Sequence, residues 1–402
     1  MRASASCPEP LRSFLASWYS VLGASFLINS SAMNFLLRQK KLRERLSSGG
    51  LDALLVSHLP NVRYLCGFTG SAGLLLVAET GSVFFTDVRY DVQARAEVKG
   101  AKVVIARSGL VGALAEWIAA RRKKSGTKLG RWTLGIEAEH LTVAERKRLE
   151  DGLPSGLRLK NTSALVERAR MVKDDGEQAL IRAAVELGAG LFDRALEVMR
   201  PGLRETDLAA EMEYAARLSG AEGMSFTTII ASGARSALPH GRATEQVIAP
   251  GGFVVCDFGV ILGGYCSDQT RTVWVGRASG PSGNEARGAY DAVRGAQEAA
   301  IATVRAGVSA GEVDAAARKV LQKAGLGRYF THSTGHGVGL EIHEAPKIAA
   351  GQKEILQPGM VITIEPGVYL PGKWGVRIED MVAVRDSGCE VLTPTGKEFL
   401  TI

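Results

Sequence analysis

The chain of 402 residues carries an internal repeat in its second half, and this repeat limits the folds open to it. The segment "PGLRETDLAAEMEYAARLSG" (201–220) matches "AGVSAGEVDAAARKVLQKAG" (306–325) in its glycines, acidic residues and alanines, at an offset of 105 residues. A second match, at an offset of 108, aligns "APGGFVVCDFG" (249–259) with "QPGMVITIEPG" (357–367). A period of about a hundred residues is too long for a solenoid. We therefore expect two copies of a unit of helices followed by antiparallel strands, related by an approximate two-fold axis.

Acidic residues occupy matched positions in apolar strands of the two copies, where Asp257 aligns with Glu365. A two-residue turn at Leu262-Gly263 would place Asp257 directly opposite Asp268, with Cβ atoms about 4.5–5.5 Å apart. In the second copy, Glu365 and Glu379 are centred on Gly372, within a candidate three-residue hairpin loop. Alternation along that strand puts Arg377 and Glu379 on the face of the site, and Val376 and Ile378 in the core.

Four carboxylates in one pocket cannot all stay ionised without cations. A single aspartate could instead cap a turn on a wet surface, but four at matched repeat positions argue against that interpretation. Four of the six histidines also lie in this region: His240, His332, His336 and His343. One imidazole with four carboxylates suits two divalent ions, with Mn²⁺ first and Co²⁺, Fe²⁺ or Zn²⁺ as alternatives. Two such ions can hold a bridging hydroxide and polarise a carbonyl group, which is hydrolytic chemistry.

Four segments resemble the proline-specific branch of the pita-bread metallopeptidases, the family of methionine aminopeptidase, aminopeptidase P, prolidase and creatinase. They are "SALPHG", "CDFGVILGGYCSDQTRT", "HSTGHGVGLEIHEAP" and "ITIEPGVYLPGKWGVRIED". Upstream, "YLCGFTGSAGLLLV" and "FTDVRYDVQA" resemble the N-terminal domain of aminopeptidase P. The resemblance implies an α/β N-terminal domain followed by an α+β pita-bread domain with an internal pseudo-two-fold duplication. It also implies a homodimer.

Carried over residue by residue, the resemblance implies five metal ligands. Asp257 would bind one ion, Asp268 and Glu379 would bridge both, and His336 and Glu365 would hold the second. Creatinase lacks the full set, whereas all five residues are present here.

The resemblance also implies catalytic and substrate-binding roles. Glu365 would accept a proton from the nucleophilic water, and His240 and His343 would contact the substrate or its tetrahedral intermediate. His332 would line the pocket for proline, and Arg377 would orient Glu379 from behind.

The predicted activity is metal-dependent hydrolysis of the Xaa-Pro bond at peptide N-termini through a bridging hydroxide. Segments "FTGSAG" and "TDVRY" favour an Xaa-Pro aminopeptidase, and an Xaa-Pro dipeptidase (prolidase) is the alternative because it shares every catalytic residue. A catalytically silent pita-bread domain that binds other proteins is a third hypothesis, although such domains typically lose metal ligands.

The chain divides by pattern into a 1–32 extension, an α/β domain at 33–170 and the catalytic domain at 171–402. Segments "DALLVSH", "GLLLVAE", "SVFFTD" and "KVVIA" predict strands of the α/β domain. "SFLASWYSVLGASFLI" (13–28) could be a secretory signal, but the helix pattern that begins at Met33 favours an over-extended start and a cytoplasmic protein. This apolar run is too short for a membrane span. The net charge of +7 forms no basic stripe, which argues against nucleic-acid binding.

Overall fold

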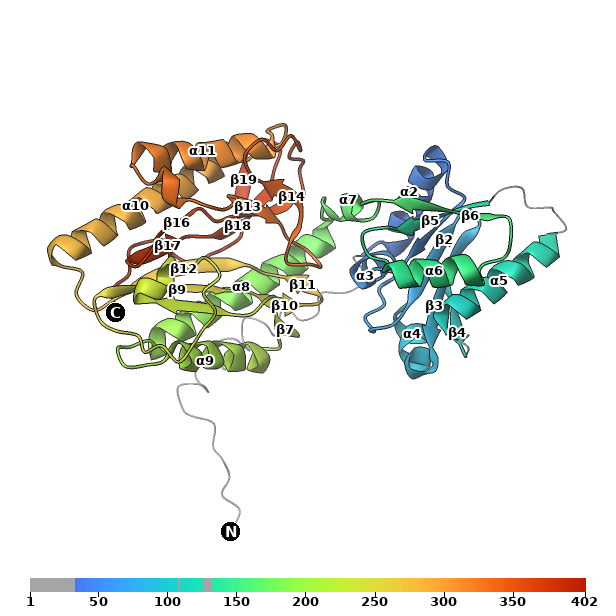
Figure 1. Cartoon of the computed structure of the whole chain (residues 1–402), viewed down its shortest axis with the longest axis horizontal. Coiled ribbons are helices and arrows are strands. Elements are labelled where there is room, and N and C mark those ends of the chain that lie inside the picture. Colours follow the sequence, from blue (N-terminus) through green and yellow to red (C-terminus); the bar gives the residue numbers. More distant parts are fainter. Residues whose placement is uncertain (1–32, 108, 126–131) are drawn as a thin grey trace, which may run out of the picture. The chain divides into compact units, whose positions relative to one another are not determined.

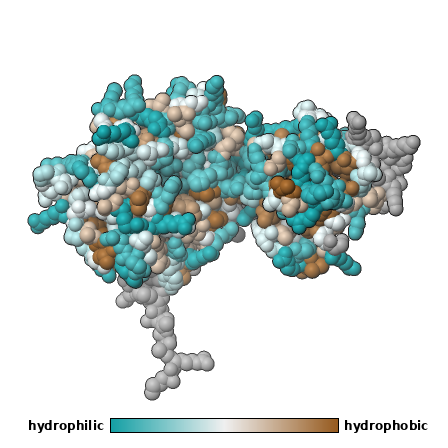
Figure 2. Space-filling model, viewed as in Figure 1, coloured by the Kyte–Doolittle hydropathy of each residue, from teal (hydrophilic) through white to brown (hydrophobic). Residues whose placement is uncertain are grey.

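The computed structural model describes residues 33–107, 109–125 and 132–402, so the predictions made for residues 1–32 fall outside the described residues. The described chain forms two compact units, Met33–Arg170 and Met171–Ile402 (Figure 1). Among the described residues, no helix is long and apolar enough to cross a bilayer. In the view of Figure 2, hydrophobic residues appear as separate spots among hydrophilic ones.

The N-terminal unit is built on a six-stranded sheet in the order β4-β3-β2-β1-β5-β6. Strands β1 and β5 run parallel, as do β5 and β6 and also β3 and β4, whereas β1–β2 and β2–β3 are antiparallel. The elements are α2 (Phe35–Ser48), β1 (Ala53–Val56), α3 (Leu59–Cys66), β2 (Leu74–Ala78), β3 (Gly81–Asp87), η2 (Val88–Tyr90), α4 (Asp91–Glu97), β4 (Ala101–Ala106), α5 (Leu110–Ser125), β5 (Trp132–Glu137), α6 (Val143–Gly152), β6 (Leu157–Thr162) and α7 (Glu167–Arg170). The four predicted strands are present. Strands β5 and β6 were not predicted, although Leu157 and Leu159 of β6 alternate with exposed Arg158 and Lys160.

The C-terminal unit contains two helix pairs of equal lengths, which confirms the duplication. Helix α8 (Asp175–Val198) has 24 residues, as does α10 (Gly280–Thr303), which begins 105 residues later. Helix α9 (Glu205–Leu218) has 14 residues, as does α11 (Ala310–Lys323), again 105 residues later. Capping boxes stabilise the first turns of α8 and α11. In each box, Asp174 with Glu177 or Ser309 with Glu312, each side chain accepts a hydrogen bond from the backbone N–H of the other residue.

Antiparallel strands fill the space between the helix pairs (Figure 1). They form the sheets β12-β9-β8, β11-β10-β7, β14-β13-β15-β18-β19 and β16-β17. The bounds are β7 (Gly223–Met224), β8 (Ile229–Ser232), η3 (Gly233–Ala237), β9 (Gly252–Phe258), β10 (Val260–Leu262), β11 (Tyr265–Cys266), β12 (Gln269–Val275), η4 (Gly327–Tyr329), β13 (Gly335–Gly337), β14 (Glu344–Ile348), β15 (Val361–Ile364), β16 (Gly367–Leu370), β17 (Trp374–Arg377), β18 (Asp380–Val384) and β19 (Cys389–Val391). Helices α8 and α9 pack on strands of the first half in one apolar core. Helices α10 and α11 pack on strands of the second half in another core, to which β9 and β12 add Phe253 and Trp274.

The first hairpin turns one residue later than predicted. Leu262 pairs with Tyr265, so the turn is Gly263-Gly264, and both glycines have positive φ (58° and 81°). Two-residue hairpin turns of the favoured twist need positive φ, which glycine adopts easily and leucine does not. The prediction that Asp257 lies directly opposite Asp268 is therefore wrong, because Asp257 faces Thr270 in the β9–β12 ladder.

The second hairpin is centred where the sequence predicted. Leu370 pairs with Trp374, which leaves a three-residue loop around Gly372, whose φ is 74°. Farther from the loop, Ile364 pairs with Asp380 in the same register. Glu365 and Glu379 thus lie where the β16–β17 ladder gives way to the β15–β18 ladder.

Candidate metal centre

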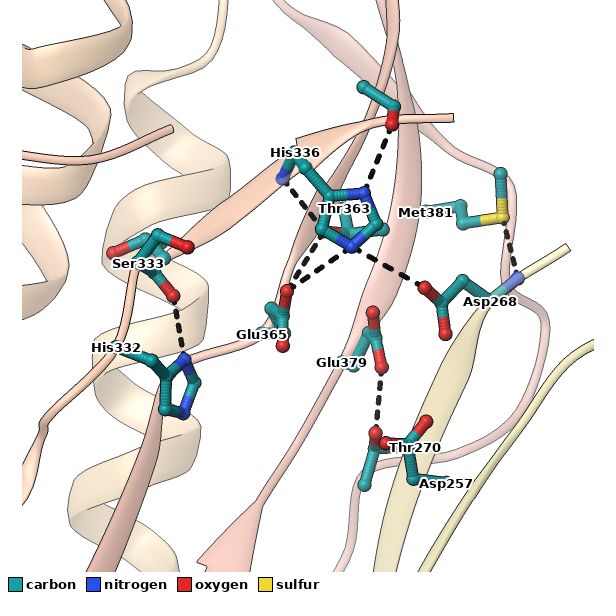
Figure 3. Close-up of polar contacts among 12 residues, drawn as sticks. Asp257, Asp268, Thr270, His332, Ser333, His336, Thr363, Glu365, Glu379 and Met381 are labelled. Atoms are coloured by element: carbon teal, nitrogen blue, oxygen red, sulfur yellow. Dashed lines mark hydrogen bonds and ion pairs between the residues drawn. The ribbon is translucent and has the colours of Figure 1, made fainter. Parts of the chain in front are cut away.

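A cavity of about 800 Å³ opens in the C-terminal unit among strands from both halves of the repeat. Its lining includes all nine residues singled out from the sequence: His240, Asp257, Asp268, His332, His336, His343, Glu365, Arg377 and Glu379. Asp268, Glu365 and Glu379 lie just outside the ends of strands, whereas Asp257 is still paired within β9, one residue before its end. Figure 3 shows Asp268, Glu365 and Glu379 arranged around the ring of His336, with Asp257 beyond Glu379. The neighbouring residues Val376 and Ile378 are fully buried in the apolar core.

The His336 ring turns an unprotonated nitrogen toward the carboxylates. Its Nδ1 lies 3.0 Å from the Gly337 carbonyl oxygen, which can only accept, so Nδ1 carries the proton. Burial lowers the pKa of His336 to about 4, so the ring is neutral near pH 7. Its Nε2 lies 3.5 Å from both Asp268 Oδ2 and Glu365 Oε1 (Figure 3). A lone pair facing two ionised carboxylates is repulsive, so a proton or a metal cation is needed between them.

The acidic groups also lack sufficient positive charge nearby. Burial, reinforced by the neighbouring carboxylates, raises the pKa of Asp268 and of Glu379 well above the ordinary range. Burial raises the pKa of Glu365 to about 7. Asp257 Oδ1 is buried and has no hydrogen-bond partner among the described residues.

These donors fit divalent cations. Asp268, His336 and Glu379 each offer a ligand atom, and these atoms lie within 4.8 Å of one another. Oxygen donors with one imidazole suit Mn²⁺-like ions better than soft metals. Asp257 and Glu365 line the same cavity and add further carboxylate oxygens.

Arg377 contacts Asp257 directly and is linked through Thr270 to Glu379, the residue that the sequence analysis expects it to orient. Its Nη2 donates to Asp257 Oδ2, and its Nε donates to Thr270 Oγ1 at 3.0 Å. The Thr270 hydroxyl in turn donates to Glu379 Oε2 at 2.7 Å (Figure 3). Arg377 and Glu379 lie two residues apart on one face, so the long guanidinium side chain extends across to the neighbouring strands. Its hydrogen-bonded link to Glu379 passes through Thr270, and its charge also acts on Glu379 directly.

His332 is held by a hydrogen-bonded chain that ends at Arg377. Arg377 Nη1 donates to the Tyr369 hydroxyl oxygen at 2.7 Å, and that hydroxyl lies 2.9 Å from His332 Nε2. Burial, followed by the charge of Arg377, lowers the pKa of His332 to about 4. Tyr369 therefore donates to a neutral ring, whose Nδ1 is 2.8 Å from the Ser333 carbonyl oxygen. Both ring nitrogens are occupied, so His332 presents a ring face or edge to the cavity rather than a donor.

The other two histidines lie at the cavity with fewer constraints. The ring of His343 meets that of His336 edge-on, with centroids 4.4 Å apart, and burial lowers the pKa of His343. His240 is exposed and follows Pro239, whose carbonyl accepts from Arg377 Nη1 at 3.0 Å.

Sequence reasoning missed four residues of the cavity region. Thr270 and Tyr369 lie two and four residues beyond Asp268 and Glu365, so continued alternation along each strand could have found them. Arg242 and Lys347 bring positive charge to the lining. Lys347 faces His336 across the β13–β14 ladder, a register that the sequence pattern does not predict.

Comparisons with known proteins agree on the family. Residues 179–386 match the metallopeptidase family M24, and residues 38–172 match the creatinase/prolidase N-terminal domain. A protein of Pyrococcus horikoshii named Xaa-Pro dipeptidase is 35% identical over 365 residues, covering 90% of this chain and 98% of that protein.

Two solved structures add detail. A Bacillus anthracis structure described as an Xaa-Pro dipeptidase matches with a TM-score of 0.86 and 38% identity, covering 92% of this chain and all of that one. A Thermotoga maritima structure described as an X-Pro aminopeptidase matches with a TM-score of 0.81 and 35% identity, covering 91% and 100%. The chain belongs to metallopeptidase family M24, in its proline-specific pita-bread branch. This family implies a hydrolase that uses divalent metal ions.

Proposed function

We propose that this M24 metallopeptidase hydrolyses the bond between an N-terminal residue and a following proline, with dipeptides as its preferred substrates. The observation that carries the proposal is the gathering of Asp257, Asp268, His336, Glu365 and Glu379 around one cavity, in a chain that spans nearly the full length of proteins named Xaa-Pro dipeptidase. The preference for a dipeptidase departs from the aminopeptidase favoured by the sequence.

The five residues around the cavity would hold two divalent cations. Asp257 would bind one, His336 and Glu365 the other, and Asp268 and Glu379 both. Mn²⁺ fits this oxygen-rich set best, with Co²⁺, Fe²⁺ and Zn²⁺ as alternatives. When bound, such ions supply Lewis acidity toward the scissile carbonyl and lower the pKa of water.

The protein's own groups would position the substrate and move its protons. Glu365, whose carboxyl group lies at the cavity with a pKa raised by burial, would take a proton from the attacking water and return it to the departing proline nitrogen. His343 and His240 would donate to the developing oxyanion, since both reach the cavity. His332, with both nitrogens occupied, would pack against the proline ring. Arg377, which donates to Asp257, would hold that carboxylate in place.

Positive charge in the lining supports the dipeptide preference. Arg242 and Lys347 line the cavity, and the described residues supply no ion pair or hydrogen bond to either side chain. The free carboxylate of an Xaa-Pro dipeptide lies only one residue from the scissile bond, so a cation beside the metal ligands can reach it. A longer peptide has a neutral amide at that position and would therefore be bound less strongly by these cations.

The direct test compares Ala-Pro with Ala-Pro-Ala as substrates of the Mn²⁺-loaded protein. We expect turnover of Ala-Pro with a kcat/KM at least about tenfold higher than that of Ala-Pro-Ala, the size of effect that one charge-assisted contact supplies. Lys347→Met and Arg242→Met should raise the KM for Ala-Pro while leaving kcat largely unchanged. Lys353→Met, an exposed lysine absent from the lining, is the matched control.

Preference for Ala-Pro-Ala would favour the aminopeptidase, which the Thermotoga maritima relative supports as the second candidate. If neither peptide is cleaved and the purified protein contains no metal, the protein is a binding module rather than an enzyme. We also propose a homodimer and a cytoplasmic location, which size-exclusion chromatography with light scattering and cell fractionation would test.

A further inference from the structure

Arg271 lies behind the cavity, where strands of the two repeat halves meet. It follows Thr270 in β12, so alternation directs its side chain away from the face that carries Thr270. Arg271 is absent from the cavity lining and is only 2% exposed. The junction it adjoins is a bridge between Thr270 and Glu379, in which the Glu379 N–H donates to the Thr270 carbonyl at 3.1 Å.

All five N–H donors of this guanidinium have an acceptor. Nη1 donates to the carbonyls of Thr270 at 2.9 Å and of Glu379 at 2.6 Å, so one nitrogen joins the backbones of both halves. Nη2 donates to Asp380 Oδ1 and to the Thr395 carbonyl, each at 2.7 Å, and Nε donates to the Gly396 carbonyl at 2.9 Å. An arginine side chain has five such donors and no acceptor, so its bonding capacity is filled.

Asp380 balances this buried charge and extends the network to the C-terminal segment. It is fully buried, and its Oδ2 accepts from Gln297 Nε2 and from Lys397 Nζ, each at 2.8 Å. Charge-assisted bonds between planar groups fix orientation as well as separation. The network therefore holds the backbone of Glu379 from behind while Thr270 holds its carboxylate from the front.

We propose that Arg271 is a positioning residue for the metal centre: it locks the Thr270–Glu379 junction and so sets the separation of Glu379 from Asp268. This inference rests on the proposed function for the identity of the bound group, but the junction can be measured without metal. Arg271 touches neither the cavity nor any candidate ligand's side chain, and it acts through two backbone carbonyls.

The test variant is Arg271→Lys, because lysine keeps the charge near Asp380 but has only three donors on one nitrogen and cannot reach five acceptors. We expect Mn²⁺ binding, measured by calorimetric titration of metal-free protein, to weaken by about 10- to 100-fold, the range for groups that orient metal ligands. In metal-free protein, hydrogen exchange of the peptide containing Glu379 should quicken, whereas peptides of β9 should keep their protection.

Two controls separate positioning from a general loss of stability. Val293→Ala removes buried methyl groups from the α10 core and should lower the melting temperature while leaving the Mn²⁺ Kd unchanged. Arg194→Lys alters an arginine that pairs with Glu197 and Glu211 far along α8 and should change neither quantity. If Arg271→Lys fails to fold, Lys397→Met tests the same network from its half-exposed end, with a smaller weakening in the same direction.

Unchanged Mn²⁺ affinity and unchanged exchange at Glu379 in a folded Arg271→Lys protein would overturn the proposal, as would equal weakening in Val293→Ala at matched melting temperature. Should wild-type protein bind no metal, the proposed function fails, yet faster exchange at Glu379 would still show that Arg271 locks the junction.

Discussion

The two hairpins that deliver the carboxylates share an origin but differ in construction. In the first, the β9–β12 ladder ends at Phe258–Gln269, and a separate short ladder surrounds the Gly263-Gly264 turn. In the second, one register continues from the loop at Gly372 into the β15–β18 ladder. Asp268 of the first hairpin and both acidic residues of the second lie where one ladder gives way to the next, whereas Asp257 is still paired within β9. Regular pairing would hold side chains apart on a sheet face, and the breaks allow them to converge.

The two hairpins also exchange arginines. Arg377 of the second pairs with Asp257 of the first at the cavity, whereas Arg271 of the first pairs with Asp380 of the second behind it. Each half therefore depends on the other for the charge that balances its own buried aspartate. Removing one partner of a buried pair is costly, because the remaining charge stays buried.

Removing a bridging candidate from the first hairpin should have the largest effect. Asp268→Asn replaces a charged ligand with a neutral amide, and we expect activity and Mn²⁺ content to fall by more than the roughly 100-fold typical of groups outside the ligand set. Circular dichroism should show an intact fold, since the change relieves repulsion among buried carboxylates. An active Asp268→Asn enzyme would exclude the bridging role.

The metal-free protein should lose stability as pH rises above about 6.5. The pKa values of Asp268, Glu365 and Glu379 are raised by burial, so the folded state binds protons that the unfolded state has released, and the free energy of unfolding falls as pH increases. The slope is about 1.4 kcal/mol per pH unit for each excess proton. Below pH 6.5, His332 and His336, whose pKa values are lowered, contribute with the opposite sign.

Urea denaturation of EDTA-treated protein between pH 6.5 and 8.5 measures this slope. Mn²⁺ should flatten the dependence, and Asp268→Asn should reduce it. A free energy of unfolding that rises across this range would contradict the raised pKa values of Asp268 in the first hairpin and of Glu365 and Glu379 in the second.

Arg377→Lys should weaken Mn²⁺ binding and kcat/KM by about 10- to 100-fold. Arg377 donates to Asp257, Thr270 and Tyr369 at once. A lysine ammonium group can bond only one of them with good geometry, so the hydrogen bonds to the other two are lost. Metal titration and steady-state kinetics of Arg377→Lys beside Arg271→Lys compare the cavity arginine with the one behind it. If Arg377→Lys loses activity but keeps its metal affinity, Arg377 acts on the substrate and does not position the metal ligands.

Glycine-to-alanine substitutions in the two hairpin turns should have the smallest effect, and on stability alone. Gly372→Ala places a Cβ at positive φ in open space, which should lower the free energy of unfolding by about 1–2 kcal/mol. Gly263→Ala adds a contact 2.8 Å from Leu180 Cδ2 and should cost more. Urea denaturation of the two variants compares their free energies of unfolding. Equal losses would indicate that Leu180 of α8 moves aside for the new Cβ at no cost.

Much of the fold could be predicted because repetition and alternation are local signals. The helix pairs, the centre at Gly372 and the burial of Val376 and Ile378 all follow from spacing. The turn at Gly263-Gly264 was misplaced because the choice between adjacent turns depends on backbone φ, which a count of positions ignores. The partners of Arg377 and the place of Lys347 opposite His336 depend on pairing between distant strands, for which the sequence carries no local pattern.

Metal stoichiometry tests the central claim, that the two halves together build one site for two cations. Wild-type protein dialysed against Mn²⁺ and then analysed by mass spectrometry for metal should contain two ions per chain. Asp268→Asn, which alters the first half, and Glu379→Gln, which alters the second, should each lose both ions or bind them far more weakly. Two ions retained at wild-type affinity in either variant, or no metal in the wild-type protein, would contradict the account.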